Sequence, residues 1–169
     1  IALTSEFFDR VKKRFGENPA EWHSGVTLAE RRRVWKMVAI GGAKLVIGAR
    51  SALFLPFMNL GLVIVDEEHD HSYKQEDGVI YNARDMAVLR SSIERSTVIL
   101  ASATPSLESW VNAKNGKYSH VQIHKRYGEA TLPSLSAIDL RKENLKSDEW
   151  ISNRLEKSIT ECLQSGDQT

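Results

Sequence analysis

The sequence predicts an α/β protein in which a parallel sheet is flanked by helices. Short apolar runs alternate with longer segments of helical periodicity, as a parallel layer requires, because each strand returns through a helix. Two runs, residues 61–65 and 97–101, are short enough to be buried strands, and both end abruptly in polar side chains. In open α/β sheets ligands bind beyond the carboxyl ends of the strands, so these two ends are the first candidates for a functional site.

The N-terminal part of the sequence predicts two helices followed by a strand. A helix capped by Thr4 or Ser5 ends at Gly16, and its apolar residues share one face. A capping box over residues 27–30 opens a second helix, and residues 44–48 then form a buried strand. Two helices and one strand therefore precede the acidic strand end.

The alternation continues after the acidic residues. A polar loop over residues 71–80 leads to a helix over residues 83–91, and Thr104 and Pro105 open another helix that ends near Gly116. The remaining predicted elements are strands over residues 119–124 and 135–140 and an amphipathic helix over residues 148–163, with Trp150, Leu155, Ile159 and Leu163 as its apolar stripe.

Composition limits the classes of function. The 169 residues are 41% hydrophobic, which fits one globular domain, and 23 basic against 22 acidic side chains give a net charge of +1, so any nucleic-acid site must be local. The single Cys162 excludes an internal disulfide framework and a multi-cysteine zinc site, and it fits a reducing cytoplasm. No apolar stretch approaches the roughly 20 residues that span a bilayer, so we expect no membrane partner.

The two strand ends carry the chemistry. Asp66 and Glu67 follow the first run, and their carboxylates are placed to hold a hydrated Mg²⁺ and to polarise a water. Ser102 and Thr104 end the second run with two hydroxyls. Together the two ends indicate nucleotide hydrolysis coupled to movement, whereas an acidic strand end by itself would fit a solvated loop equally well.

Five stretches, taken in order, carry a resemblance to a known family. They are Ile47-Gly48-Ala49-Arg50-Ser51-Ala52-Leu53-Phe54, Asp66-Glu67-Glu68-His69-Asp70, Ser72-Tyr73-Lys74-Gln75, Tyr81-Asn82-Ala83-Arg84-Asp85 and Ser102-Ala103-Thr104-Pro105-Ser106-Leu107-Glu108. Over roughly residues 1–140 they resemble the primosomal protein N′ family of replication-restart DNA helicases, in superfamily 2. The resemblance implies a RecA-like fold of the P-loop NTPase type. It assigns residues 1–140 to a partial first motor lobe, with the end of motif Ia and motifs Ib, II and III, and residues 141–169 to a helical segment leading toward a zinc region and a second lobe.

The resemblance also assigns roles to single residues. It makes Asp66 the carboxylate that holds Mg²⁺ through water, Glu67 the base that orients the attacking water, and His69 the link to Ser102 and Thr104. The implied DNA contacts are Arg50 and Ser51 on the backbone, and Tyr73, Lys74, Tyr81 and Arg84 in an aromatic-rich loop that stacks on unpaired bases. For either tyrosine alone, ordinary partial burial is the simpler explanation.

The family's phosphate-binding loop has no counterpart in this sequence, in which no Gly-x-x-x-x-Gly-Lys-Ser/Thr motif occurs. We therefore expect a fragment, truncated at the N-terminus, that by itself neither hydrolyses ATP nor binds it tightly. Zinc is expected in a complete family member and not in this chain. The open edge of residues 97–101 should either cause self-association or be filled by residues 119–124 or 135–140.

The implied cofactors are ATP and Mg²⁺, and the implied partners are DNA forks and single strands, with primosome and single-strand-binding proteins at stalled forks. Two alternatives stay open. One is a non-hydrolysing DNA or protein interaction module with a degenerate ATP site. The other is a hydrolase whose catalytic metal is bound by Asp66, Glu67, His69 and His71. The basic run at residues 31–33 and the four tryptophans fit a solvated helix face and ordinary packing.

Overall fold

The computed structural model describes residues 4–124, 135–143, 145 and 149–166, and the chain divides into two compact units, residues 1–120 and 121–169. The first unit contains every predicted site residue. The predicted boundary at residue 140, between a partial motor lobe and a helical segment, stays a prediction.

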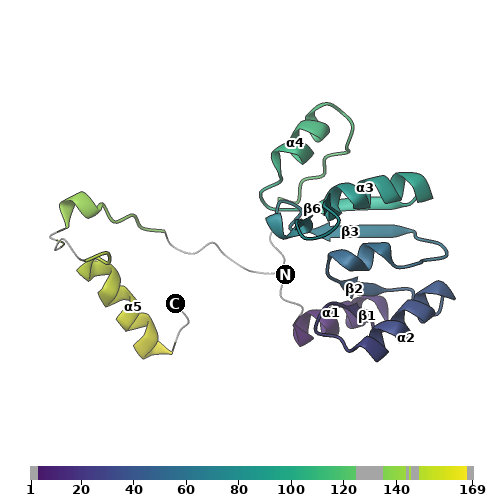
Figure 1. The fold of residues 1–169 in the computed structure, drawn as a ribbon. Helices are drawn as coiled ribbons and strands as arrows, with labels where there is room; N and C mark the ends of the chain where they lie inside the picture. Colours follow the sequence, from purple (N-terminus) through teal and green to yellow (C-terminus); the bar gives the residue numbers. More distant parts are fainter. Residues whose placement is uncertain (1–3, 125–134, 144, 146–148, 167–169) are drawn as a thin grey trace. The chain divides into compact units, whose positions relative to one another are not determined.

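The first unit is built from short parallel strand pairs with helices beside them (Figure 1). Its main elements are α1 (Ser5–Phe15), β1 (Ala20–Trp22), α2 (Leu28–Ala39), β2 (Val46–Gly48), the 3₁₀ turn η1 (Arg50–Phe54), β3 (Leu62–Asp66), the 3₁₀ turn η2 (His71–Tyr73), β4 (Lys74–Gln75), β5 (Tyr81–Asn82), α3 (Ala83–Glu94), β6 (Thr97–Ala101) and α4 (Leu107–Lys114). Strands β1 and β2 pair in parallel, as do β3 and β6, whereas β4 and β5 form a small antiparallel hairpin. Helix α2 packs on β1, and α3 packs on both β3 and β6. The predicted α/β class is thus confirmed.

Local capping fixes the helix ends where the sequence predicted them. The Thr4 hydroxyl accepts a hydrogen bond from the Phe7 N–H (3.3 Å), and Gly16 ends α1 in the left-handed region at φ 74°. Thr27 caps α2 by accepting from the Glu30 N–H (3.2 Å). The capping box is not reciprocal, however, because the Glu30 carboxylate pairs with Arg33.

The hydrophobic core of the first unit lies between α2, β2 and η1. Val34, Val38 and Leu55 are fully buried at its centre. The partly buried side chains around them are Ala20, Trp22, Ala43, Val46, Ala52 and Phe57. This core holds η1, with Arg50 and Ser51, against the β1–β2 pair.

The β3–β6 pair is less buried than the sequence predicted. Val65 is buried under α3, whereas Ile64 and its paired residue Ile99 are 58% and 45% exposed. Side chains alternate between the two faces of a strand, and α3 covers one face only within the described residues. The two runs are therefore half-buried strands, although both were predicted to be buried on both faces.

Two further predictions of secondary structure are wrong. Residues 119–124 and 135–140 form no strand, so neither replaces a partner along the open edge of β6. Self-association through that edge stays a prediction. Helix α4 begins after Ser106, whose hydroxyl accepts from the Ser109 N–H, and not at Thr104 and Pro105.

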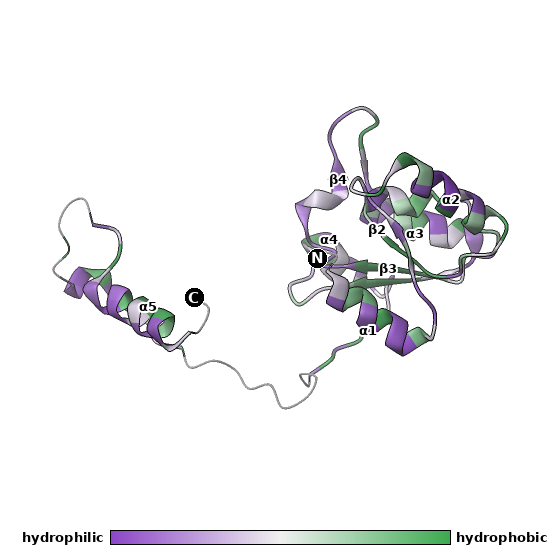
Figure 2. Cartoon of the chain, turned by 90° about the horizontal axis from the view of Figure 1, so that it is seen from below, coloured by the Kyte–Doolittle hydropathy of each residue, from purple (hydrophilic) through white to green (hydrophobic). Residues whose placement is uncertain are grey.

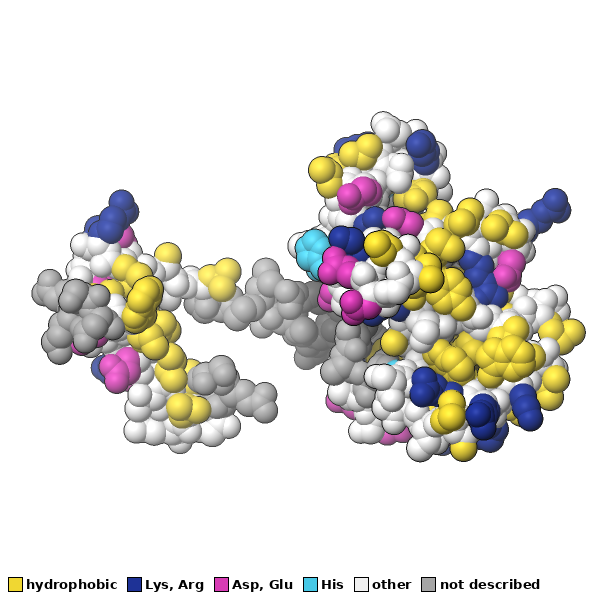
Figure 3. Space-filling model, viewed as in Figure 1, with side chains coloured by type: hydrophobic (Ala, Val, Ile, Leu, Met, Phe, Trp, Pro, Cys, Tyr) yellow, Lys and Arg dark blue, Asp and Glu magenta, His cyan; other side chains and the backbone are white. Residues whose placement is uncertain are grey.

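The second unit contains one long helix, α5 (Asn153–Ser165), after the 3₁₀ turn η3 (Leu140–Lys142). Ser152 caps α5 and Gly166 ends it. Hydrophobic and hydrophilic residues alternate around α5 (Figure 2), and an apolar stripe is visible along it (Figure 3). Trp150 precedes the helix and is 89% exposed, so it does not belong to the predicted stripe.

A substitution at Gly48 tests how closely β1 and β2 approach each other. A Cβ added there would lie against the Trp22 carbonyl oxygen and 2.9 Å from the Ala52 Cβ, so the strands would have to separate. We predict that Gly48→Ala lowers the free energy of unfolding by about 1–3 kcal/mol, measured by urea denaturation of the chain. The matched control is Gly61→Ala, whose Cβ would meet nothing within 4 Å. Equal stability of the two variants would contradict this packing argument.

Candidate active site

The carboxyl ends of β3 and β6 meet at one edge, as the parallel register requires. Asp66 pairs with Ala101, and the Glu68 N–H donates to the Ala101 carbonyl oxygen (3.0 Å). The next residues are thereby brought together, and His69 Nδ1 lies 2.7 Å from Ser102 Oγ. Thr104 contributes its backbone N–H, which donates to the same hydroxyl (3.0 Å). The structure therefore joins the two strand ends through the residues to which the resemblance assigned that link.

The Asp66–Glu67 turn presents two carboxylates beside this contact. Glu67 has φ 49°, in the left-handed region that non-glycine residues rarely adopt. Its N–H donates to Asp66 Oδ1 (3.1 Å), and its carboxylate lies 3.5 Å from His69 Nδ1. The Glu67 side chain is 47% exposed, so the carboxylate faces solvent. Acidic side chains and a histidine are visible at this edge beneath α4 in Figure 3.

Glu68 has a role that the sequence did not indicate. It is 2% exposed, and its carboxylate accepts hydrogen bonds from the Ser106 N–H (2.6 Å), the Ser106 hydroxyl (2.9 Å) and the Ser109 hydroxyl (2.9 Å). Burial would raise the pKa of Glu68, but these bonds and the nearby Arg84 charge lower the pKa below its ordinary value. Glu68 is therefore an ionised, buried anchor that fixes the start of α4 to the acidic turn.

Arg84 completes this buried network from the start of α3. Its guanidinium lies 3.4 Å from Glu68, donates to the Ser106 hydroxyl (2.8 Å) and pairs with Asp85 (2.8 Å). Its side chain is only 11% exposed. This geometry disfavours the predicted contact of Arg84 with DNA, because the charge is already engaged inside the protein.

Tyr73 connects the aromatic-rich loop to the acidic turn. Its hydroxyl donates to the Asp66 carbonyl oxygen (2.6 Å). Burial, reinforced by the charges of Asp66, Asp70 and Glu67, raises the pKa of Tyr73, so the phenol keeps the proton that it donates. The Tyr73 residue is partly buried.

The other predicted DNA contacts lie around the same loop. Arg50 Nη1 donates to the Lys74 carbonyl oxygen (2.6 Å), and Lys74 Nζ pairs with Glu76 (2.9 Å). The exposed Ser51 hydroxyl accepts a hydrogen bond from the Trp22 indole N–H (3.1 Å). Tyr81, by contrast, packs edge to face against Phe54 at 5.2 Å, which is the packing role that its partial burial suggests. Arg50 thus holds η1 against the loop that carries Tyr73.

The donor set of the site favours a hydrated cation over a caged one. In the described ranges no three side chains of histidine, cysteine, aspartate or glutamate are grouped to hold a metal ion. The carboxylates of Asp66 and Glu67 are the oxygen donors that Mg²⁺ prefers, and Mg²⁺ usually keeps several waters and needs only one or two protein carboxylates.

None of the helices in the described ranges has the length and apolar character that a bilayer-spanning segment needs.

Comparisons with known proteins agree with this geometry. Residues 1–112 match the DEAD/DEAH box helicase family, whose fold is RecA-like. The chain is similar to the replication restart protein PriA of Rickettsia felis (44% identical over 168 residues), Haemophilus influenzae (42% over 168) and Bacillus subtilis (38% over 169). Each alignment covers 99% of this chain and 26%, 23% and 21% of these relatives, respectively. The chain thus spans about a quarter of the length of the curated relatives that it matches.

Glu68→Gln tests the buried anchor. Glutamine keeps the size of the side chain but removes its charge and turns an NH₂ toward buried donors. We expect the free energy of unfolding at neutral pH to fall by about 2–3 kcal/mol, as for the loss of hydrogen bonds to a buried charge. Glu76→Gln, which removes an exposed ion pair with Lys74, is the matched control and should change stability little.

The pH dependence of stability gives a second test of whether the buried Glu68 is ionised. Because the pKa of Glu68 is lower in the folded state, the ionised carboxylate adds to the free energy of unfolding at neutral pH. This contribution is lost as the pH falls below about 4.3, the ordinary pKa of a glutamate, and through the lower pKa of the folded state. The difference in stability between the unsubstituted chain and Glu68→Gln should therefore shrink in this acid range. A difference that stayed constant down to pH 3 would contradict an ionised anchor.

Proposed function

Because the chain belongs to the DEAD/DEAH box helicase family, we propose that it forms part of the first motor lobe of an ATP-dependent DNA helicase that acts in replication restart. The similarity to PriA proteins supports the restart role. The observation that carries the proposal is the 2.7 Å contact between His69 and Ser102, which joins the acidic end of β3 to the end of β6. The proposed motor would act in the cytoplasm on forks and single strands, with primosome and single-strand-binding proteins as partners.

In this proposal the acidic turn performs the hydrolytic step. Bound Mg²⁺ would neutralise charge on the β- and γ-phosphates of ATP. Asp66 would hold the ion through water, and Glu67 would orient the attacking water as its base. The exposed Glu67 carboxylate and the strained backbone of the turn support this division of roles. Phosphoryl transfer depends on positioning and charge stabilisation, so a turn fixed by Glu68 suits it.

The same turn is placed to sense DNA. Arg50 and Ser51 would contact the DNA backbone, and Tyr73 and Lys74 would meet unpaired bases and phosphates. Because the Tyr73 hydroxyl is bonded to the Asp66 carbonyl oxygen, a base that displaces the Tyr73 ring would also move the acidic turn. DNA occupancy and water positioning would then be coupled directly.

The polypeptide of residues 1–169 by itself should lack the activity. Its sequence contains no Gly-x-x-x-x-Gly-Lys-Ser/Thr motif, so nothing in it would cradle the β- and γ-phosphates opposite Asp66 and Glu67. We propose that turnover requires the longer protein, in which zinc is also expected. The longer helicase is therefore the form to assay.

Glu67→Gln in the longer helicase is the direct test. We predict that DNA-stimulated ATP turnover falls by at least a hundredfold, because the water loses its base, while nucleotide affinity is unchanged within about twofold. Turnover is measured by phosphate release, and affinity by fluorescent-nucleotide titration. Glu76→Gln is the control and should retain turnover. Unchanged turnover in Glu67→Gln would show that Glu67 is not the base. Absence of turnover in the unsubstituted longer protein would favour the alternative, a non-hydrolysing interaction module.

Tyr73→Phe separates ring stacking from signalling. The variant keeps the ring and loses only the hydroxyl bond to Asp66. We expect single-strand affinity to stay the same while the stimulation of ATPase by DNA drops several-fold, because about 1 kcal/mol of hydrogen bonding no longer ties the loop to the turn. Weakened DNA binding with normal stimulation would contradict the proposed coupling.

A further inference from the structure

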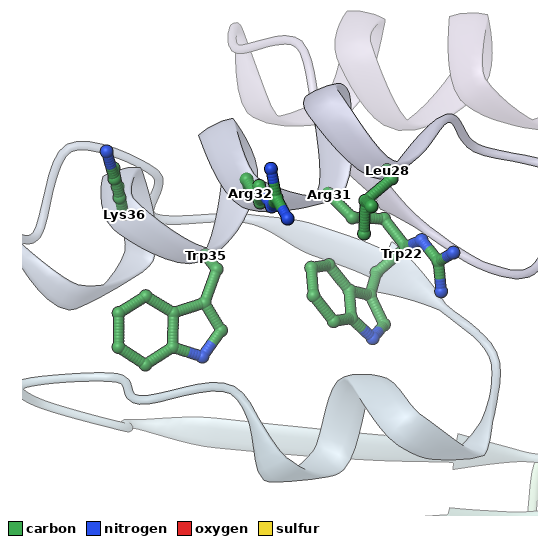
Figure 4. A pocket seen from close by; sticks show the side chains of 6 residues that line it. All are labelled: Trp22, Leu28, Arg31, Arg32, Trp35 and Lys36. Carbon is green, nitrogen blue, oxygen red and sulfur yellow. The ribbon is translucent and has the colours of Figure 1, made fainter.

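Two tryptophans and two arginines form a surface platform on the first unit, on the side of β1 and α2. We call Trp22, Trp35, Arg31 and Arg32 the indole platform. Figure 4 shows the two indole rings lying side by side, with the Arg31 guanidinium near Trp22. With Leu28 and Lys36 these residues line an open hollow of about 240 Å³. Such a volume is smaller than an ordinary ligand pocket of about 300–1,000 Å³ and suits one planar group resting on the surface.

Trp35 is more exposed than the predicted packing role of the tryptophans requires. Val34 and Val38 turn the inner face of α2 into the core, and Trp35 stands beside that face with 49% of its surface exposed. Trp22 is partly buried against the same core, so its ring is held rigidly. A fixed ring next to an exposed one provides a preformed surface for stacking.

Among the residues that the structure describes, the cations of the platform have no acidic partner. In the described ranges no ion pair involves Arg31, Arg32 or Lys36, whereas Arg33 on the same helix is bound by Glu30 at 2.5 Å. The Arg31 Nε atom is buried and has no hydrogen-bond acceptor among the described residues. Figure 3 shows basic side chains gathered over α2 beside an apolar patch.

The platform adjoins the proposed DNA path. The Trp22 indole N–H donates to the Ser51 hydroxyl (3.1 Å), and Arg50 precedes Ser51 in η1. A DNA strand whose backbone contacts Arg50 and Ser51 would pass directly from these residues onto the indole rings. This continuity favours a nucleic acid over an acidic peptide as the occupant.

We propose that the indole platform is a subsite for single-stranded DNA, in which unpaired bases stack on Trp35 and Trp22 while phosphates contact Arg31 and Arg32. The proposal rests on the proposed helicase function and adds a further segment to its DNA-binding surface. Aromatic stacking accepts any base, because every base has a π-face, and the arginines contact the backbone without reading sequence. The subsite therefore binds without sequence preference, as a translocating motor requires.

The test uses the longer helicase and a fluorescein-labelled oligo-dT strand, with affinity measured by anisotropy. Trp35→Ala should weaken binding about five- to a hundredfold, as for the loss of one stacked base. Trp35→Phe should restore most of the affinity. Trp110→Ala is the matched control, since Trp110 is also a half-exposed tryptophan, but it lies on α4 and packs against His120 and Lys114. It should bind like the unsubstituted protein.

Charge is tested separately through the salt dependence of the same affinity. Arg31→Gln should flatten the slope of log K against log salt by about 0.7, the value for one phosphate contact on a single strand. Arg33→Gln, on the same helix but paired with Glu30, should leave the slope unchanged.

The outcomes separate the subsite from the function on which it rests. Equal affinities of Trp35→Ala and the unsubstituted protein would overturn the subsite and leave the helicase proposal standing. Failure of the unsubstituted protein to bind oligo-dT at all would contradict the helicase proposal itself. Weakened binding of a fluorescent acidic peptide to Trp35→Ala, with DNA affinity intact, would also overturn the subsite and make the platform a protein-docking site.

Discussion

A single buried carboxylate fixes the geometry on which the candidate site depends. Glu68 belongs to the acidic turn after β3, yet its partners lie at the start of α4 and in α3. Removing a carboxylate from water is expensive unless strong donors replace the water, and here one backbone N–H, two hydroxyls and the Arg84 guanidinium do so. Because three of these donors lie at the start of α4 and the fourth lies in α3, the buried carboxylate ties the acidic turn to two helices. Asp66 and Glu67 belong to the same turn and are held in place with it.

From this fixed turn a series of direct contacts leads toward the proposed DNA side. The Asp66 carbonyl oxygen accepts from Tyr73, the Lys74 carbonyl oxygen accepts from Arg50, and the neighbouring Ser51 accepts from Trp22. All three are hydrogen bonds of 2.6–3.1 Å, and the second and third join residues 24 and 29 positions apart in the sequence. A displacement at one end therefore has a short route to the other, without rearrangement of the hydrophobic core around Val38 and Leu55. Such an arrangement suits a site in which occupancy of one ligand alters the chemistry of another.

Sequence reasoning succeeded where the determining interactions are local. Thr4, Gly16 and Thr27 cap helices through bonds within four residues, and strong apolar periodicity gave β3, β6 and the helices. The family resemblance implied the link between His69 and Ser102, and the parallel pairing of β3 with β6 brings these two residues together. The role of Glu68 could not be found in this way, because its partners lie 16, 38 and 41 positions away. The short strand β1 carries too few residues to show a period, and Thr104 lost the α4 cap to Ser106.

The half-buried β3–β6 pair shows why the site can keep its shape on a partly covered sheet. Ile64 and Ile99 stay exposed on one face, so hydrophobic burial there does not hold the strand ends in place. Five pairs of facing residues along the two strands and the Glu68 network supply the constraint instead, and the network acts at the carboxyl end. The polar network is thus more important for the candidate site than the apolar face is. The geometry of the acidic turn consequently follows from the hydrogen bonds of Glu68 to distant parts of the sequence more than from the burial of the strand that leads to the turn.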